Sequence, residues 1–232
     1  FLLCLPEFQH ILFLKGERSV RRFKFLFILI FNLSVVNFLA SQQIENELDR
    51  RVKDFLDTHK YEWHYENIST SDGKALYEII VKNNYKRALE IGTSTGHSAI
   101  WIAWALSKTG GKLITIEIDE WRHRKAIENF KEAGLLDYID ARLGDAHKIV
   151  PELEGPFDFI FIDADKDWYV NYLKILLPKL KVGGCFTAHN VLNLRFMRGI
   201  KKFLDYLYSL PNLKTTIIRS SRSGISVSYK IK

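Results

Sequence analysis

Cysteine is scarce in this chain of 232 residues, which has two, Cys4 and Cys185. Neither belongs to a Cys-x-x-Cys pair or a Cys/His cluster, so neither a disulfide framework nor a structural zinc site is indicated, and a reducing compartment fits best. The chain also lacks the G-x-G-x-x-G turn of nicotinamide enzymes and, after its first strand, the Gly-Lys-Ser/Thr of P-loop enzymes. Both enzyme classes are therefore disfavoured.

Charge is spread along the chain rather than gathered in one run. The 34 Lys and Arg residues outnumber the 27 Asp and Glu residues, which gives a formal net charge of +7. A solvated basic surface is a plainer interpretation of this pattern than a dedicated anion-binding arm. With 47% hydrophobic and 26% charged residues, the composition is that of one globular domain with a sizeable core.

Residues 1–40 differ in kind from the rest. Four basic residues precede an uncharged apolar stretch at 25–40, a signal-like pattern, although Phe38 is large for its place before a cleavage after Ala40. The segment has three interpretations: a signal, upstream translation that is not protein, or a membrane anchor through residues 25–44, which reaches the ~20 residues of a span. We exclude it from the fold and expect one domain at 41–232.

From residue 41 the pattern alternates between helices and short apolar strands. Apolar residues at helical spacing predict a helix up to about His59, and another is expected at Gly73–Lys82. Gly183 and Gly184, with Pro178, are expected to break the chain around one strand. The predicted strands are RALEI, KLITIEI, YIDARL, FDFIFID, CFTAH, TTIIRS and GISVSYKI. This alternation predicts a doubly wound, mostly parallel, seven-stranded α/β sheet whose last two strands form an antiparallel edge hairpin.

Polar residues and glycines gather where the first three strands end. Ligands of an open parallel sheet bind outside the carboxyl ends of the strands, so these residues are candidates for a site. A glycine turn that leads into a helix, followed by an acid that can accept ribose hydroxyls, predicts a nucleoside ligand. Taken singly, each has a plainer interpretation as a turn, a surface acid or a helix cap. The candidates are Glu90, Gly92, Gly96, Ser98, Glu117 and Asp145.

Several of these segments together resemble a known family. LEIGTSTGHSAI, GKLITIEID, GDA, FDFIFIDADKDWYVNY and the closing GISVSYKIK are similar to the S-adenosylmethionine-dependent O-methyltransferases of the catechol and caffeoyl-coenzyme A type. The resemblance implies that Glu90 and Gly92 contact the amino acid part of the donor, with Ser98 nearby. It also implies that Glu117 holds the ribose and Asp145 borders the adenine. Ser69 falls where the family has a hydroxyl residue that contacts the donor.

The resemblance further implies a reaction centre after the fourth strand. In that family the acid at this place, here Asp163, binds a divalent cation, and the lysine three residues on, here Lys166, is the proposed general base. A hard cation chelated by two vicinal oxygens lowers the pKa of the acceptor hydroxyl and fixes it for attack on the methyl group. The plainer interpretation of this cluster is the charged start of a helix.

The segment after the fifth strand departs from the family. The family has Asp-Asn there, whereas this chain has His189 and Asn190. Histidine is a poor ligand for Mg²⁺ and a better one for manganese, iron, cobalt or zinc. Three hypotheses are open: a transition-metal site made by Asp163, His189 and Asn190; metal-free transfer with His189 or Lys166 as general base; or a histidine that only satisfies a hydrogen bond.

The acceptor is a small catechol-like phenol by resemblance, but other partners stay open. The chain lacks the long insertion that plant relatives carry after the Asn, so the acceptor site is expected to be open, with a basic rim. That rim keeps a hydroxylated uridine of transfer RNA as an alternative acceptor. A non-catalytic donor-binding protein and a homodimer are further alternatives. The expected rim residues are Arg195, Arg198, Lys201 and Lys202.

Two further expectations concern packing and location. Aromatic residues at helical spacing predict core or interface packing rather than base stacking. They are Trp101, Trp104, Trp121, Phe203, Tyr206 and Tyr208. Because S-adenosylmethionine is a cytosolic metabolite, a cytoplasmic location is expected, with a membrane anchor through residues 25–44 as the alternative.

Overall fold

The computed structural model describes residues 43, 47–63, 66–192, 198–219 and 221–232. The chain divides into two units, of which the second, Asp49–Lys232, contains the whole sheet. The predicted signal or anchor at 1–40 and the rim residue Arg195 lie outside the described residues. Within the described part of the chain, no helix combines the length and apolarity that crossing a membrane requires.

Seven strands form one sheet in the order β3-β2-β1-β4-β5-β7-β6. Neighbours from β3 to β5 pair in parallel, whereas β7 pairs antiparallel with both β5 and β6. The predicted mostly parallel sheet with an antiparallel edge hairpin is therefore confirmed. The strands are β1 (Arg87–Ile91), β2 (Lys112–Glu117), β3 (Ile139–Leu143), β4 (Phe157–Ile162), β5 (Leu180–His189), β6 (Leu213–Ile218) and β7 (Ile225–Lys230).

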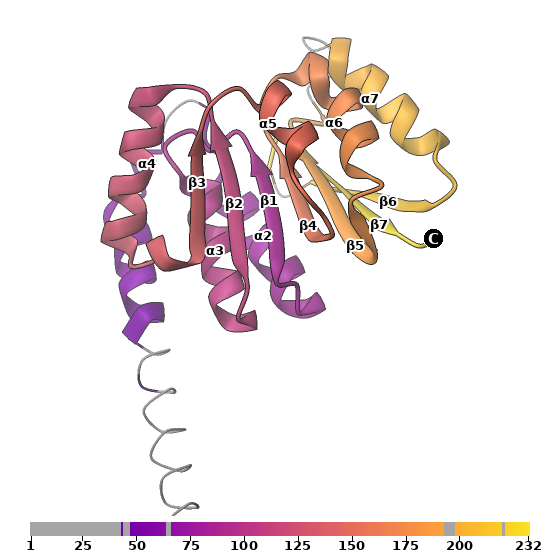
Figure 1. The fold of residues 1–232 in the computed structure, drawn as a ribbon. Helices are drawn as coiled ribbons and strands as arrows, with labels where there is room; N and C mark the ends of the chain where they lie inside the picture. Colours follow the sequence, from indigo (N-terminus) through magenta and orange to yellow (C-terminus); the bar gives the residue numbers. More distant parts are fainter. Residues whose placement is uncertain (1–42, 44–46, 64–65, 193–197, 220) are drawn as a thin grey trace, which may run out of the picture. The chain divides into compact units, whose positions relative to one another are not determined.

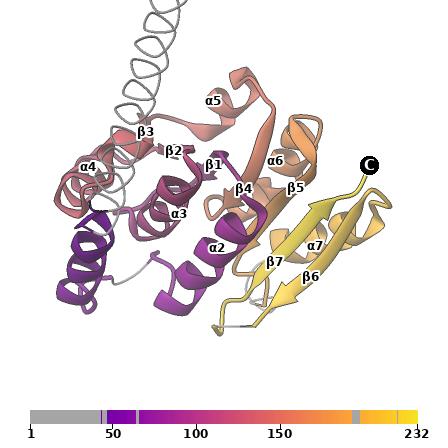
Figure 2. The same cartoon turned by 90° about the horizontal axis from the view of Figure 1, so that it is seen from below.

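Helices cover both faces of this sheet (Figures 1 and 2). One face carries α2 (Thr70–Asn83), α3 (His97–Thr109) and α4 (Glu120–Ala133), and the other carries α5 (Ala146–Glu152), α6 (Tyr169–Leu176) and α7 (Arg198–Ser209). The chain winds outward from β1 to β3 on the first face and then returns to β4 and β5 on the second. The order in which strands are added to the sheet therefore reverses between β1 and β4, and a ligand cleft is expected at this point.

The buried centre of the sheet explains the long apolar run of β4. All six of its residues are buried, because the strand lies between β1 and β5 with helices on both faces. Asp158 is the polar exception, and its carboxylate accepts hydrogen bonds from the backbone N–H groups of Lys86 and Arg87 at 2.8 and 3.0 Å. The predicted helix near residues 44–59 is helical at 49–58, with Val52 and Phe55 buried.

Three local predictions are corrected. Strand β5 begins at Leu180 and runs through Gly183 and Gly184 instead of starting after them, and the pairing of β4 with β5 absorbs the glycines by a register shift between Phe157 and Phe159. Helix α2 starts earlier than predicted, at Thr70, because the Ser69 side chain caps it by accepting from the Asp72 N–H. Of the aromatic residues predicted to pack in the core or at an interface, Trp121 and Tyr208 do not pack in the core, since they are 63% and 58% exposed; interface packing stays a prediction for these two.

The turn after β1 generates a prediction about stability. Gly92 and Gly110 both have positive φ, 95° and 70°. A methyl group on Gly92 would lie 2.4 Å from the backbone oxygen of Asp163, whereas one on Gly110 would meet nothing within 4 Å. We expect Gly110→Ala to lower the free energy of unfolding by ~1 kcal/mol, the cost of a left-handed alanine. We expect Gly92→Ala to lower it by a further ~1–3 kcal/mol because of the clash.

Urea unfolding of the two variants measures this difference. An equal loss of unfolding free energy in the two variants would contradict the prediction. It would show that the backbone near Asp163 moves away from residue 92 at no measurable cost in free energy.

Candidate functional site

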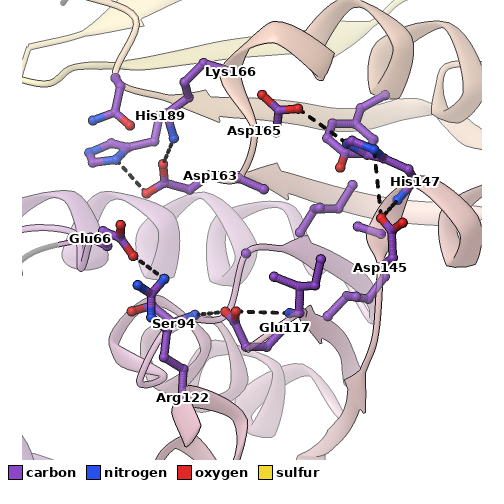
Figure 3. Close-up of a pocket in the computed structure, with 18 of the residues that line it drawn as sticks. Glu66, Ser94, Glu117, Arg122, Asp145, His147, Asp163, Asp165, Lys166 and His189 are labelled. Carbon is purple, nitrogen blue, oxygen red and sulfur yellow. Dashed lines mark hydrogen bonds and ion pairs between the residues drawn. The ribbon is translucent and has the colours of Figure 1, made fainter. Parts of the chain in front are cut away.

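A cavity of about 790 Å³ opens at the carboxyl ends of β1 to β5. Figure 3 shows its charged side chains converging from several of these strand ends. Four predicted site residues, Ser69, Glu90, Gly96 and Ser98, do not line the cavity itself. The predicted site residues that line it are Gly92, Glu117, Asp145, Asp163, Lys166, His189 and Asn190.

The turn after β1 forms one wall of the cavity. The N–H groups of Gly92 and Thr93 both donate to the carbonyl of Ile116, at 3.0 and 3.2 Å, so the turn is fixed to β2. Gly96 does not reach the cavity but forms the N-cap of α3 with a φ of 100°, and a side chain there would meet the ring of Phe130. Ser98 lies buried in the first turn of that helix.

Glu117 is a buried and oriented carboxylate, not a surface acid. Its residue is 5% exposed, and it accepts hydrogen bonds from the backbone N–H groups of Ser94 at 2.7 Å, Ile118 at 3.0 Å and Asp119 at 3.0 Å (Figure 3). A carboxylate offers about four acceptor sites, so three N–H donors leave one for a ligand. The remaining acceptor site could take a hydrogen bond from a hydroxyl group of a ligand in the cavity.

Glu90 lies close to the other cleft carboxylates without lining the cavity. The Thr115 hydroxyl donates to its Oε2 at 2.5 Å, and Oε1 has no hydrogen-bond partner among the described residues. Burial raises the pKa of Glu90 to about 8, and the nearby charges of Asp163 and Glu117 push in the same direction. An uncompensated acceptor at this place is suited to a cationic ligand group.

Asp145 combines two of its predicted roles. It lines the cavity and also caps α5, since its side chain accepts from the N–H of His147 at 2.9 Å. The His147 ring lies 3.5 Å from a carboxylate oxygen of Asp165 (Figure 3). The same ring stacks on Trp168, with the ring centroids 3.8 Å apart. These side chains join the ends of β3 and β4 along one side of the cavity.

Asp163 is the centre of a cluster of four ionisable side chains. Its Oδ2 lies 2.8 Å from Nδ1 of His189, and its Oδ1 accepts from Nζ of Lys166 at 2.5 Å (Figure 3). Nε2 of the same histidine lies 3.2 Å from Oδ2 of Asp72, at the start of α2. His189 and Asp72 are almost fully buried, 4% and 0% exposed, so their charges have little access to water.

This cluster changes the pKa values of its members. Burial alone would lower the pKa of His189, but its hydrogen bonds to Asp163 and Asp72, together with their charges, raise it to about 9. Burial likewise opposes ionisation of Asp163, but His189 and Lys166 hold the pKa of that carboxyl below its usual value. At neutral pH the ring is therefore an imidazolium that donates on both sides, which makes His189 a poor general base.

The arrangement does not fit the predicted metal site. A cation bound by Asp163, His189 and Asn190 needs a nitrogen lone pair and a free carboxylate oxygen. Both ring nitrogens of His189 face carboxylates instead, and both oxygens of Asp163 are taken by cationic donors. Among the residues that the structure describes, no group of three or more His, Cys, Asp or Glu side chains is placed to hold a metal ion.

The sequence analysis missed several residues of the site. Asp72 follows Ser69 in a pattern typical of a helix start, but nothing local indicates its contact with a residue 117 positions away. Arg122 and Glu66 also line the cavity and form an ion pair with each other (Figure 3). Arg122 lies in the first turn of the helix after β2, which is the one sequence signal that could have suggested it.

The expected basic rim is only partly present in the described residues. Arg198 and Lys202 are exposed, and Lys201 pairs with Asp205 at 2.8 Å. None of these three lysines and arginines lines the cavity. The structure therefore places these basic side chains on α7 but not in the lining of the cavity.

Comparison with known proteins identifies the family. A family model described as O-methyltransferase matches residues 41–217. Over 140 residues the chain is 37% identical to caffeoyl-CoA O-methyltransferase 1 of Eucalyptus globulus, covering 58% of this chain and 56% of that protein. Over 130 residues it is 40% identical to catechol O-methyltransferase of Niastella koreensis, covering 54% and 58%. The matched part thus spans somewhat more than half the length of these relatives.

Solved structures agree with the sequence comparison. The O-methyltransferase from Bacillus cereus in complex with SAH has a TM-score of 0.69 and 26% identity, covering 79% of this chain and 91% of that one. The O-methyltransferase TomG from Streptomyces achromogenes in complex with SAM has a TM-score of 0.69 and 25% identity, covering 78% and 90%. Together with the family match over most of the described sheet, these likenesses show that the chain belongs to the O-methyltransferase family.

Proposed function

We propose that this chain transfers a methyl group from S-adenosylmethionine to a hydroxyl oxygen of a small catechol-like phenol. One observation carries the proposal: a carboxylate suited to ribose, Glu117, and a charged cluster suited to a reacting hydroxyl, around Asp163, line the same cavity. The family membership, and relatives named for caffeoyl-CoA and catechol, support the reaction and the acceptor class.

The donor half of the cavity has side chains and a turn that suit S-adenosylmethionine. Glu117 would accept from the ribose hydroxyls, and the bare backbone of Gly92 would allow close approach of the ligand. Asp145 would lie at the adenine. Glu90, with its unpaired Oε1, would attract the positive charge of the donor's amino acid part. Ser69, Gly96 and Ser98 would support these groups, since they do not line the cavity.

The acceptor half would favour the ionised form of the hydroxyl. In the reaction the oxygen forms a bond to the methyl carbon as the carbon–sulfur bond breaks, and the hydroxyl proton must leave. Lys166, whose ammonium donates to Asp163 at 2.5 Å, would take this proton after giving one of its own to water, and Asp163 would stabilise the ammonium that forms again. The imidazolium of His189 would add a fixed positive charge near the developing phenolate. Alignment of the two substrates accounts for the remaining catalysis.

The other hypotheses of the sequence stay predictions. A transfer-RNA acceptor, a homodimer, a non-catalytic donor-binding role and the placement of residues 1–40 are not tested by the described residues. We also keep the cytoplasm as the proposed location, since the donor is made there. Catechol-type transfer is favoured over these because the cavity brings the donor-type and the reaction-type carboxylates together.

The first prediction concerns the proton acceptor. We expect Lys166→Met to lower kcat for 3,4-dihydroxybenzoate by ~100-fold or more, the usual loss when a general base is removed. Lys148→Met is the matched control, because that side chain is 85% exposed and pairs only weakly with Asp145 at 3.9 Å. Transfer of labelled methyl by the full chain measures both. Donor binding without any methylated catechol would count against phenols as acceptors.

The second prediction concerns the ribose carboxylate. We expect Glu117→Gln to weaken S-adenosylmethionine binding by ~10–100-fold, because a charged acceptor of hydrogen bonds is lost. Glu120→Gln, on the exposed start of α4, should leave binding unchanged. Calorimetric titration of the donor into each variant gives the two dissociation constants. Equal constants would remove Glu117 from the donor site.

The third prediction uses the pKa of Glu90, which burial raises to about 8. A cationic donor stabilises the ionised carboxylate, so binding should lower this pKa, release a proton near neutral pH and tighten as pH rises towards 8. Titrations in two buffers of different ionisation enthalpy measure the released proton. Glu90→Gln should abolish the buffer dependence. A heat of binding that is the same in both buffers for the parent protein would refute the proposed contact.

A further inference from the structure

The ring of His189 is held on both sides by carboxylates from distant parts of the chain. Asp163 follows β4 and contacts Nδ1 at 2.8 Å, and Asp72 begins α2 and contacts Nε2 at 3.2 Å. All three side chains have at most 10% exposure. Because each ring nitrogen faces an acceptor, the doubly protonated ring satisfies both contacts at once.

A count of charges shows that this cluster is already neutral. Asp72 and Asp163 supply two negative charges, and the imidazolium of His189 and the ammonium of Lys166 supply two positive ones. The neighbouring acid Glu90 adds little at neutral pH, because burial keeps it largely protonated. A divalent cation would therefore bring two uncompensated charges into a buried place, which is costly.

The contacts also leave a cation without its ligands. To bind one, His189 would have to lose a proton and give up at least one carboxylate, and Asp163 would have to release Lys166. Of the three predicted ligands, Asn190 is the one that would not have to give up one of these hydrogen bonds. The charge balance and the hydrogen bonds therefore both oppose binding of a divalent cation.

We propose that the side chains of His189 and Lys166 together occupy the role of a divalent cation in this cleft, with Asp72 as a second carboxylate that positions the histidine ring. The positive charge of His189, joined by that of Lys166 when it holds the proton, would stabilise the phenolate oxygen that a metal would otherwise hold. Asp72 is a positioning residue, itself held by the hydroxyl of Ser69, which donates to its Oδ2 at 2.9 Å. The part of this inference that concerns the reaction rests on the proposed function, whereas the part that concerns metal binding does not.

Titration of the full chain with MnCl₂, followed by calorimetry and by the electron paramagnetic resonance signal of free Mn²⁺, tests the metal part. The parent protein should show no specific Mn²⁺ binding. His189→Asp exchanges a positive charge for a negative one. The net charge of the cluster then falls from zero to −2, and the new carboxylate supplies an oxygen ligand. We expect this variant to bind Mn²⁺ at least ~100-fold more tightly than the parent.

Two double variants test the role of Asp72. In the His189→Asp background, Asp72→Asn removes a carboxylate of the cluster and should weaken Mn²⁺ binding by ~10-fold. Asp165→Asn is the matched control, because Asp165 lines the same cavity but contacts His147 instead of His189. It should leave the affinity nearly unchanged. Equal losses in the two double variants would show that Asp72 has no special place in the cluster.

The parent protein alone can overturn the inference, even if His189→Asp does not fold. Stoichiometric Mn²⁺ binding by the parent that is lost in His189→Ala would establish histidine ligation instead. Methyl transfer that stops on treatment with a chelator and returns with Mn²⁺ would show that the reaction needs a metal and would also overturn the inference. Absence of methyl transfer under all conditions would refute the proposed function, while the Mn²⁺ titrations would still decide the metal part.

Discussion

The arrangement of side chains in the cleft depends on balancing the negative charge of the Asp163 carboxylate. The residue directly follows the fully buried strand β4, where an unpaired negative charge would cost several kcal/mol. His189 and Lys166 compensate it from two directions, and His189 in turn contacts Asp72. These contacts therefore connect the ends of β4 and β5 to the start of α2. They also determine which side chains can face an acceptor.

The doubly wound sheet sets where this cluster meets the donor. Because β1 to β5 run in parallel, their carboxyl ends share one edge, and the reversal between β1 and β4 opens the cavity there. Gly92, Glu117 and Asp145 follow the first three strands, whereas Asp163 and His189 come with the next two. Under the proposed function, the ends of the first three strands would hold the donor, and the ends of β4 and β5 would face the acceptor.

The family and the individual residues answer different questions. Membership of the O-methyltransferase family accounts for the doubly wound sheet. It does not decide how the acceptor hydroxyl is activated, because function depends on the side chains of a site and not on its fold. If the inference about His189 holds, a histidine at the end of β5 would let the protein balance by itself the negative charge of Asp163.

The sequence by itself determined the seven strands, the edge hairpin and the residues at the strand ends, because hydrophobic period and strand-end chemistry are local properties of the chain. By resemblance, it also predicted a departure from the family at His189. Only the tertiary structure placed β7 between β5 and β6, ran β5 through Gly183 and Gly184, and left Trp121 exposed. It alone brought Asp72 to His189, across 117 positions of sequence. Long-range pairs of this kind have no local signal, since they arise when separate elements bury their charges against one another.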